Sequence, residues 1–546
     1  MEEAIKELLK KFSKNIKDRK DLEAIKRIVC KKYGLDSILN SEILKEYRNL
    51  LSAGKIKEIK PLMGIVRKRS IRTLSGIAPV AVLTKPYPCP GSCAYCPHEK
   101  NVPTSYLSNE PAVMRAIRCG YDPYKQVVLR LNSLENNGHA PTKIEIIVIG
   151  GTWSYLPKKY KYWYIVNCFR AANDYSKIRK TVFSNTRQEE FFKKKLKSFY
   201  SQNNSLSELK KFLVKEQKKN ERADYQIIGL TLETRPDYID DKELEEMRDL
   251  GCTRVEIGVQ VIDDEILKIN KRGHGVKEIV EATKMLKEYG FKITYHLMPA
   301  LPGATPGKDF KMFKKLFEDE RFQPDQIKFY PTVVTAGSLL YKWYKEGRYK
   351  PYSDKVLQKL IIDCKKIVPK YVRIIRLIRD IPGESIIAGN KITNLRQIMK
   401  DRGVKCNCIR CREIKDGKIG PAKINVIDYS SSGGHEYFIA ADSQDGETLY
   451  GFCRLRIDKG SRVASAIIRE LHVYGELVPV GGLKKVQHGG LGRKLLNRAE
   501  ELAQQNKAEN IAVISGVGVR GYYRKMGYKL SGNYMKKVFD KRSSLN

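Results

Sequence analysis

The sequence lacks long hydrophobic runs and is short of acidic residues. No uninterrupted apolar stretch approaches the roughly 20 residues that a membrane-spanning helix needs, so we expect no membrane protein. The first residues, MEEAIKELLKKF, lack the apolar core of a signal peptide. Only 62 Asp and Glu stand against 103 Lys and Arg, which gives a net charge of +41. This excess of positive charge indicates a polyanionic partner. A membrane surface is the alternative, because it would attract the same positive charge.

The cysteines also lack the even distribution of a disulfide framework. Six of the twelve are bunched into two short loops with metal-ligand spacing, and the others are scattered singly. We therefore expect a soluble protein of a reducing, cytoplasmic compartment. The 546 residues exceed the size at which a single core stops growing, so two or more domains are expected.

The first cysteine loop is Pro88–Pro97, PCPGSCAYCP, and it carries Cys89, Cys93 and Cys96. Its prolines and glycine prevent a helix, so the three thiols must converge from a loop. Three thiolates can hold three irons of a [4Fe–4S] cluster and leave the fourth iron for a non-protein ligand. A zinc ion held by the same thiols and His98 is the alternative. The C-x3-C-x2-C spacing resembles that of radical S-adenosylmethionine enzymes, which implies that S-adenosylmethionine binds the open iron.

Strand-like and helix-like segments alternate after residue 76. This alternation predicts a parallel sheet covered by helices, and about six units predict a partial (β/α)6 barrel. Chemistry in such barrels lies at the carboxyl ends of the strands, where the cysteine loop also falls. The predicted strands are Ile77–Lys85, Lys143–Gly151, Gln226–Thr234, Arg254–Val261, Lys292–Pro299 and Gln326–Val334, with helices at Asp241–Leu250 and Val276–Tyr289.

Five further residues follow predicted strands and are expected at the same rim. Gly150, Gly151 and Thr152 resemble the Gly-Gly-Glu element of radical S-adenosylmethionine enzymes, which approaches the cofactor's amino group; Thr152 stands where those enzymes have Glu. Glu233 and Arg235 end the next strand. They are candidates for contacts with the ribose and carboxylate of the cofactor, and a rim salt bridge is the alternative.

Two segments carry much of the positive charge. Residues 1–75 have a helical pattern, and twenty Lys and Arg against ten acids precede residue 81, with a run at Arg67, Lys68, Arg69 and Arg72. We interpret this segment as a surface for RNA phosphates, and a solvated helical face is the alternative. The Lys-rich residues 188–222 interrupt the alternation of strands and helices and are expected to form an insertion on the surface.

The second cysteine loop, CNCIRC, carries Cys406, Cys408 and Cys411. Three thiolates within six residues are typical of a structural zinc site, with His435 or His472 as candidate fourth ligand. A second iron–sulfur cluster is the alternative. Either metal would join the barrel to the domain that follows.

From about Lys423 the pattern becomes antiparallel, and it ends in a glycine-rich loop before a helix. Such a loop cradles a pyrophosphate through its amide groups and the helix dipole. The segment resembles the acetyl-CoA loop of GCN5-related N-acetyltransferases, and VRGYYRKMGY resembles their tyrosine-bearing helix. Tyr522 and Tyr523 are candidates for the general acid that protonates the departing thiolate, or they are core aromatics. The loop residues are Gln487, Gly489, Gly490, Leu491 and Gly492.

This combination over nearly the whole chain resembles the family of Elongator catalytic subunits in an archaeal, stand-alone form. The words that carry the resemblance include RTLSGIAPVAVLTKP, LTLETRPDYI, RELHVYGELVP and ISGVGVRGYYRKMGY. The resemblance implies a tRNA uridine(34) acetyltransferase, a carboxymethyluridine synthase that acts at C5 of the wobble uridine in the anticodon stem-loop. It also implies that Lys143 contacts acetyl-CoA, that Lys328 and Tyr330 lie between the two active sites, and that pantetheine pairs with the strand containing Glu470, Leu471, His472 and Val473.

The expected architecture is therefore an α/β multidomain protein. It comprises a basic helical segment (1–75), a radical S-adenosylmethionine domain (76–390), a cysteine-rich linker (391–422) and an α+β acetyltransferase domain (423–546). A protein lysine acetyltransferase with a structural cluster is the rival function, but its basic substrates would be repelled by this chain. An RNA-binding scaffold without catalysis is a third hypothesis. The electron donor is unknown, and the choice between a monomer and a homodimer stays open.

Overall fold

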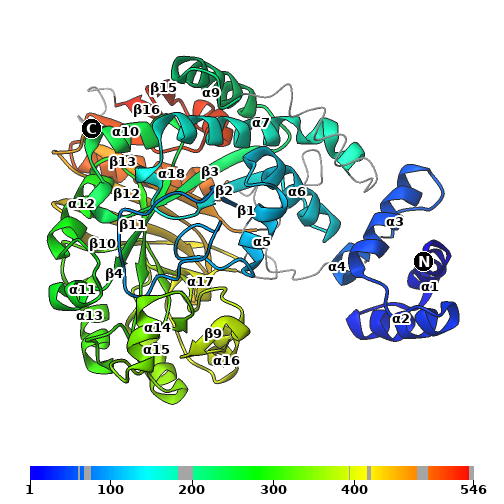
Figure 1. Cartoon of the computed structure of the whole chain (residues 1–546). Helices are drawn as coiled ribbons and strands as arrows, with labels where there is room; N and C mark the ends of the chain where they lie inside the picture. Colours follow the sequence, from blue (N-terminus) through cyan, green and yellow to red (C-terminus); the bar gives the residue numbers. More distant parts are fainter. Residues whose placement is uncertain are drawn as a thin grey trace.

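A computed structural model shows a parallel half-barrel joined to a second, mixed sheet, with a helical unit at the amino end (Figure 1). The structure describes residues 1–59, 62–66, 76–182, 201–392, 394–414, 420–475 and 490–539. Arg67, Lys68, Arg69, Arg72, Gln487 and Gly489 lie outside these ranges. None of the helices in the described ranges is both long and apolar enough to cross a membrane.

The half-barrel is a seven-stranded, all-parallel sheet in the order β1-β2-β3-β4-β5-β6-β8. Its outward side chains are branched and buried against helices, as the near-continuous apolar runs of a covered parallel sheet require. The strands are β1 (Ala78–Leu83), β2 (Lys143–Ile149), β3 (Gln226–Thr234), β4 (Arg254–Gln260), β5 (Lys292–Leu297), β6 (Gln326–Phe329) and β8 (Arg373–Arg376).

Helices between the strands cover the outer face. They are α5 (Pro111–Arg118), α6 (Pro123–Asn136), α7 (Lys158–Val182), α9 (Leu206–Asn220), α10 (Asp241–Asp249), α11 (Asp264–Ile269), α12 (Val276–Glu288), α13 (Pro306–Glu318), α14 (Leu339–Lys345) and α15 (Asp354–Ile367). After them come a small ribbon of β7 (Val334–Thr335) and β9 (Ile386–Ala388), then α16 (Leu395–Asp401) and α17 (Ile409–Arg412).

The predicted partial barrel is confirmed, with one strand more than expected. All six predicted strands are present, and β8 closes the row beside β6. The described part of residues 188–222 does not form the insertion on the surface that was expected. Here α9 packs along α7 and buries Leu209 and Leu213, so it thickens the helical layer rather than leaving it.

The second sheet has seven strands in the order β10-β11-β12-β13-β14-β16-β15. Its first four strands are antiparallel, whereas β13 and β14 are parallel. The helix α18 (Leu491–Gln505) packs on this sheet through Leu495, Leu496 and Ala499. The elements are β10 (Lys423–Ser431), β11 (Gly434–Asp442), β12 (Leu449–Ile457), β13 (Ala466–Val473), β14 (Asn510–Val513), α19 (Arg520–Arg524), β15 (Lys529–Ser531) and β16 (Tyr534–Val538).

The second sheet closes the amino-terminal end of the barrel. The buried Asp325, just before β6, accepts hydrogen bonds from Arg469 of β13 (Nη1 to Oδ2, 2.8 Å). A Cβ on Gly516 would lie 2.0 Å from the carbonyl oxygen of Ile228 in β3, so only glycine permits this approach of the two backbones. Charge pairing and close backbone contact therefore fix the two sheets against each other.

The amino-terminal unit consists of α1 (Glu2–Asn15), α2 (Arg19–Tyr33), α3 (Asn40–Ser52) and α4 (Leu62–Val66). It has a hydrophobic cluster of its own, which includes Leu8, Phe12 and Val29. The unit stands apart from the barrel in Figure 1 and contacts it at α6, where Arg48 donates to the carbonyl of Glu135. The unit therefore has a core of its own, and one of its basic residues, Arg19, lines the same cavity as residues of the barrel.

Candidate active sites

The first cysteine loop follows β1 and lies at the carboxyl ends of the barrel strands. Cys89, Cys93 and Cys96 line one cavity there. Arg272 donates to the sulfur of Cys93 at 3.2 Å, and the Nη1 of Arg235 lies 4.0 Å from it. A hydrogen bond from Cys96, followed by the charge of Arg272, lowers the pKa of Cys93 to about 4 against the effect of burial. The loop is therefore built to hold a thiolate.

These thiols fit a cluster better than a single ion. Zinc thiolate bonds of about 2.3 Å place tetrahedral sulfurs about 3.8 Å apart. Among the described residues, the three sulfurs do not form a group within 4.8 Å, and His98 is exposed and joins no such group. Three soft ligands around an open cavity, with two guanidinium groups beside them, suit a cluster with a net negative ligand set.

The predicted rim residues lie around the same cavity. Gly150 has a φ of 129°, and a Cβ there would lie 2.3 Å from the hydroxyl of Thr84, so this turn requires glycine. Gly151 and Thr152 line the cavity, and the hydroxyl of Thr152 lies 4.0 Å from the sulfur of Cys89. The turn that carries Thr152 therefore lies beside the thiol loop.

Glu233 and Arg235 also line the cavity but have different surroundings. The guanidinium of Arg235 pairs with Asp237 at 2.8 Å and faces Cys93, so it serves the thiol loop. Glu233 accepts from Tyr106 at 3.4 Å, and its other oxygen lies 3.6 Å from the Nδ1 of His296. Of these two residues, Glu233 is the one whose side chain faces the open part of the cavity.

A charged cluster inside the barrel joins two predicted residues, Lys328 and Tyr330, to Glu256 and His296, which the sequence analysis missed. The Nε2 of His296 (β5) lies 2.9 Å from Glu256 (β4), and Lys328 (β6) pairs with the same carboxylate. Burial opposes ionisation of Glu256, but Lys328 and His296 hold its pKa well below the usual range. The ring of Tyr330 packs edge-on against His296 at 5.6 Å. Polar or charged residues at alternate positions of otherwise apolar strands were the signal that could have found this cluster.

The second sheet opens at the place expected for acetyl-CoA. The parallel pairing of β13 with β14 runs from Ala466 to Ile468 and stops there, whereas β13 continues to Val473 on its other edge with β12. Among the described residues, Leu471 and Val473 lie beyond the part of β13 that pairs with β14. Gly490 precedes α18 with a φ of 74°, and Leu491 and Gly492 form the helix's first turn. The end of β13 faces the start of a helix, where an anion and an amide-bearing arm can both bind.

The two tyrosines of α19 have different positions. A Cβ on Gly492 would lie 3.1 Å from the hydroxyl of Tyr522, so this phenol lies at the start of α18. Tyr522 is 36% exposed, whereas Tyr523 is 6% exposed and packs in the core against Tyr528. Burial raises the pKa of both phenols. Tyr522 is thus the phenol that can reach a ligand.

Comparison with known proteins agrees with this geometry. The radical SAM superfamily model matches residues 87–316, a radical SAM C-terminal domain 324–403 and the acetyltransferase (GNAT) family 416–528. A tRNA uridine(34) acetyltransferase of Dehalococcoides mccartyi is 43% identical and covers 87% of this chain and 100% of its own. Elongator complex protein 3 of Homo sapiens is 36% identical over 95% and 93% of the two chains. The chain belongs to the Elongator complex protein 3 family. A solved archaeal Elp3 of Methanocaldococcus infernus, without its first 46 residues, has a TM-score of 0.69 at 36% identity and covers 85% and 99% of the two chains.

The predicted family and the fusion of the two enzyme types are therefore confirmed. As a member of the Elongator complex protein 3 family, the chain is an enzyme with a radical S-adenosylmethionine half-barrel and a GNAT domain. The first fold implies a [4Fe–4S] cluster and S-adenosylmethionine, and the second implies acetyl-CoA.

In this Elongator-family chain both sites open into one cavity of about 1330 Å³. The three thiols line it at the carboxyl end of the barrel, and Glu470, His472 and Tyr474 line it at the amino end. Glu470 pairs with Lys292 of β5 at 2.8 Å and with Arg454 at 3.1 Å. Burial opposes the charge on Glu470, but Lys292 and Arg454 lower its pKa to about 2. The side chain of Glu470 thus joins the two domains.

Lys143, Lys328 and Tyr330 have distinct places in the barrel. Lys143 begins β2, at the end of the barrel that faces the GNAT domain, and burial lowers its pKa. It is absent from the lining of the shared cavity. Lys328 and Tyr330 do line that cavity, near the carboxyl ends of the strands.

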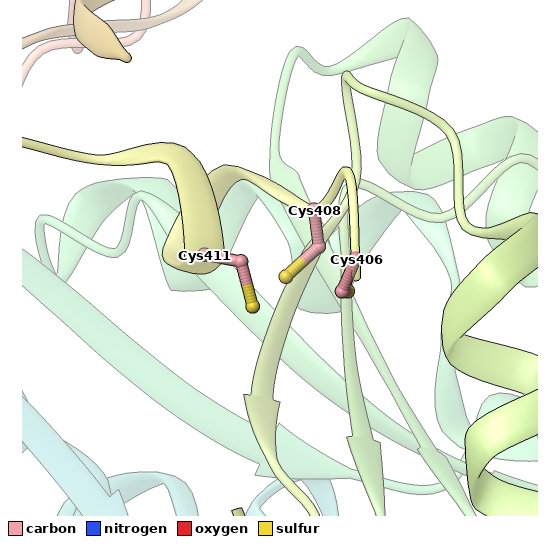
Figure 2. A group of neighbouring side chains, drawn as sticks. All are labelled: Cys406, Cys408 and Cys411. Carbon is pink, nitrogen blue, oxygen red and sulfur yellow. The ribbon is translucent and has the colours of Figure 1, made fainter. Parts of the chain in front are cut away.

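The second cysteine loop forms a compact group in the linker (Figure 2). The sulfurs of Cys406, Cys408 and Cys411 lie within 4.8 Å of one another, a spacing that suits one tetrahedral ion. Within the described part of the chain this group contains no histidine. The Nε2 of His435 lies 3.1 Å from Asp428, and His472 stacks on Phe452. Neither predicted fourth ligand is therefore in place.

Two cations lie beside these thiols. The ammonium of Lys365 lies 3.8 Å from the sulfur of Cys411, and the Nη1 of Arg396 lies 4.0 Å from it. They offset the negative charge that three thiolates around a divalent ion would carry.

Proposed function

We propose that this protein modifies C5 of the wobble uridine, position 34 of tRNA, by radical chemistry that uses S-adenosylmethionine and acetyl-CoA. One observation carries the proposal: a single cavity is lined by the cysteine loop and by the acetyl-CoA strand β13. A cluster and an acetyl donor that open into the same space serve one reaction rather than two. The names of the relatives, tRNA uridine(34) acetyltransferase, supply the substrate.

The chain's residues would divide the work between the two ends of the cavity. Cys89, Cys93 and Cys96 would ligate the cluster, which with S-adenosylmethionine supplies a 5′-deoxyadenosyl radical. Gly150, Gly151 and Thr152 would present backbone and hydroxyl groups to that cofactor. Glu233 would accept a hydrogen bond from a ribose hydroxyl, and Arg235 would hold the charge of the thiolates. Lys328 and Tyr330 would line the path of the substrate.

At the other end, the GNAT domain would hold and cleave the thioester. The backbone of β13 at Leu471–Val473 would pair with pantetheine, and the turn at Gly490–Gly492 would bind the pyrophosphate together with Gln487 and Gly489. Tyr522 would donate its proton to the departing thiolate of CoA, as a general acid next to the helix start. Lys143 would contact CoA from the barrel side. Tyr523 would support Tyr522 through their edge-on contact at 5.2 Å.

We also infer the predicted division of the chain at residues 75, 390 and 422, with a zinc ion on Cys406, Cys408 and Cys411 in the linker. All twelve cysteines are free, which supports a reducing, cytoplasmic compartment. The basic amino-terminal unit would bind tRNA phosphates. Neutralising the exposed Lys17, Lys20 and Lys31 with Gln should then lower the slope of log affinity against log salt by up to about 0.9 for each phosphate that no longer has a cation beside it.

The decisive experiment is mass spectrometry of uridine 34 after incubation of the reconstituted enzyme with tRNA, S-adenosylmethionine, reductant and acetyl-CoA. We expect a carboxymethyl mass increment that requires all four components. The rival, a protein lysine acetyltransferase, predicts instead that a lysine-rich peptide accelerates CoA release. An unmodified uridine 34 together with an acetylated peptide would replace the proposed function with the rival.

A further inference from the structure

Three tyrosines form a partly exposed patch beside the first cysteine loop. Each follows one of the first three strands of the barrel: Tyr87 comes after β1, Tyr155 after β2 and Tyr238 after β3. The ring centres lie 6.1 Å apart for Tyr87 and Tyr155 and 5.8 Å apart for Tyr155 and Tyr238. Tyr87 is 36% exposed and Tyr155 is 42% exposed. Large aromatic side chains that are exposed and in contact mark an interaction site, and we call these three residues the tyrosine patch.

The tyrosine patch borders the thiol loop. Tyr87 lies two residues before Cys89, and Tyr155 lies three residues after Thr152, whose hydroxyl is 4.0 Å from the sulfur of Cys89. In the described part of the chain, Cys89 and Thr152 line the shared cavity, whereas the three tyrosines do not. Cys89 is also partly exposed, while Cys93 is buried. The patch therefore lies next to the thiol loop on a side that the cavity does not use.

Exposed lysines lie beside the tyrosine patch. The amide of Lys85 donates to the hydroxyl of Tyr160 at 3.0 Å, and its ammonium lies 5.0 Å from the centre of that ring, so this segment packs on the start of α7. The first turn of α7 carries the exposed Lys158 and Lys159 and no acidic residue. Lys158 also pairs with Glu246 at 2.8 Å. Lysines in a first turn oppose the helix dipole, so their presence there indicates a role in binding an acidic partner.

The radical chemistry of the proposed function needs one electron that the chain cannot supply itself. This electron enters at the first cysteine loop, since its thiols would hold the cluster. The cavity side of the loop is open to the two cofactors and to the substrate uridine. A carrier protein therefore needs another side of the loop, and the tyrosine patch offers one.

A protein fits the tyrosine patch better than RNA does. Unpaired bases stack on open ring faces. In the patch the rings meet edge to face, with interplanar angles of 63° and 85°, so ring faces are partly covered by the edges of their neighbours. Exposed tyrosines with a polar margin are instead typical of protein interfaces.

We propose that the tyrosine patch, with Lys85, Lys158 and Lys159 at its margin, is the docking surface for a small acidic protein that carries one electron at low potential. The carrier would lose one electron, the cluster on the thiol loop would gain it, and no covalent bond would form or break. Pro86 and Pro88 restrict the backbone on both sides of Tyr87, which lowers the entropy lost on docking. This inference rests on the radical half of the proposed function and adds the partner that this half requires.

The test uses an acidic flavodoxin as the carrier and the reconstituted enzyme, without oxygen. Binding of oxidised flavodoxin is measured by calorimetry, and reduction of the cluster by flavodoxin hydroquinone is followed by the loss of cluster absorbance. The test variant combines Tyr87→Ser with Tyr155→Ser, two exposed positions. Tyr344→Ser on α14 is the matched control, because Tyr344 is also 36% exposed.

We expect the double variant to weaken flavodoxin binding by about ten-fold or more, and the control variant by less than about two-fold. Reduction by flavodoxin should slow in the double variant to the same extent. Reduction by dithionite should be equally fast in wild type and variant, because this small reagent needs no docking surface.

Reversing the charge at the margin gives an independent check. Lys85→Glu combined with Lys159→Glu should weaken flavodoxin binding and flatten its dependence on salt. Lys342→Glu is the control, because the side chain of Lys342 on α14 is 72% exposed and should change both quantities much less.

No binding by wild type, equal binding by the tyrosine variant, or equally slow reduction of that variant by dithionite would each overturn the docking surface. A tyrosine variant that binds flavodoxin normally but tRNA more weakly would overturn it too, because the patch would then belong to RNA. None of the flavodoxin measurements needs tRNA or acetyl-CoA. If wild type modifies uridine 34 while the tyrosine variant binds flavodoxin like wild type, the docking surface fails and the proposed function stands.

Discussion

Substitution of Asp325 by Asn tests the charge network between the barrel and the GNAT domain. The carboxylate is 0% exposed and accepts from Arg469 at 2.8 Å and from the amide of Ile293 at 2.9 Å, with Arg454 at 3.5 Å. Asn keeps the shape and an acceptor for the amide but removes the charge. Arg469 keeps Glu436 at 3.0 Å and Arg454 keeps Glu470 at 3.1 Å, but both lose the carboxylate that they share. Removing one partner of a buried ion pair costs about 3–5 kcal/mol.

The measurement is the midpoint of unfolding in guanidinium chloride at pH 7, followed by circular dichroism. The matched control is Glu501→Gln, which breaks an exposed pair with Arg498 at 2.9 Å and should cost about 0–1 kcal/mol. A loss for Asp325→Asn of no more than about 1 kcal/mol, equal to that of the control, would refute the assigned role of the network.

The pH dependence gives a second check on the same residue. Burial opposes ionisation of Asp325, but Arg469 and Arg454 hold its folded-state pKa below the unfolded value of 3.8. A carboxylate with a depressed folded pKa contributes stability above its unfolded pKa and loses that contribution as the pH falls. The stability gap between wild type and Asp325→Asn should therefore narrow below about pH 4.

Three further predictions concern other sites. Burial, partly offset by Glu436, lowers the pKa of Lys287 from 10.5 to about 7, so the unfolded chain binds more protons between these values and wild-type stability should rise with pH there. Lys287→Met should lack this rise in chemical denaturation curves, and an unchanged rise would contradict the assignment. Tyr522→Phe should slow tRNA-stimulated thiol release from acetyl-CoA by about 10²–10⁴-fold, whereas Tyr523→Phe should change it little; equal effects would remove Tyr522 as the acid. Cys408→Ser should lower the bound zinc measured by mass spectrometry to below one half of wild type while the iron content stays unchanged, and a parallel loss of iron would point to an iron–sulfur cluster at this loop instead.

Local patterns in the sequence predicted most of the strands because each has a clear apolar run. The prediction for β3 at Gln226–Thr234 matches its observed bounds, and β10 begins at Lys423, where the antiparallel pattern was expected to start. The short strand β8 was not predicted, since its four residues, Arg-Ile-Ile-Arg, show no alternation and are too few to form a clear apolar run. Its place at the edge of the sheet depends on pairing with β6, which is a long-range contact.

The sequence predicted those parts of the candidate sites whose residues lie close together along the chain. The thiols of the first loop could be grouped from their sequence, but Arg272 reaches Cys93 from 179 residues away. Adjacent tyrosines on a helix point about 100° apart, so Tyr522 and Tyr523 could not be distinguished before the orientation of α19 was known. The cluster of Glu256 and His296 required the register of β4 and β5.

The ion pair that joins the amino-terminal end of the barrel to the GNAT domain affects the order in which the protein matures during synthesis. Arg469 follows its partner Asp325 by 144 residues, so the ribosome completes the barrel strands before it supplies the side chain that neutralises their buried charge. At 5–20 residues per second this interval lasts roughly 7–30 s. During that time the amino end of the nascent barrel exposes the carboxylate of Asp325 to solvent. The barrel is thus a late-maturing structure, and its final packing awaits the last domain to leave the ribosome.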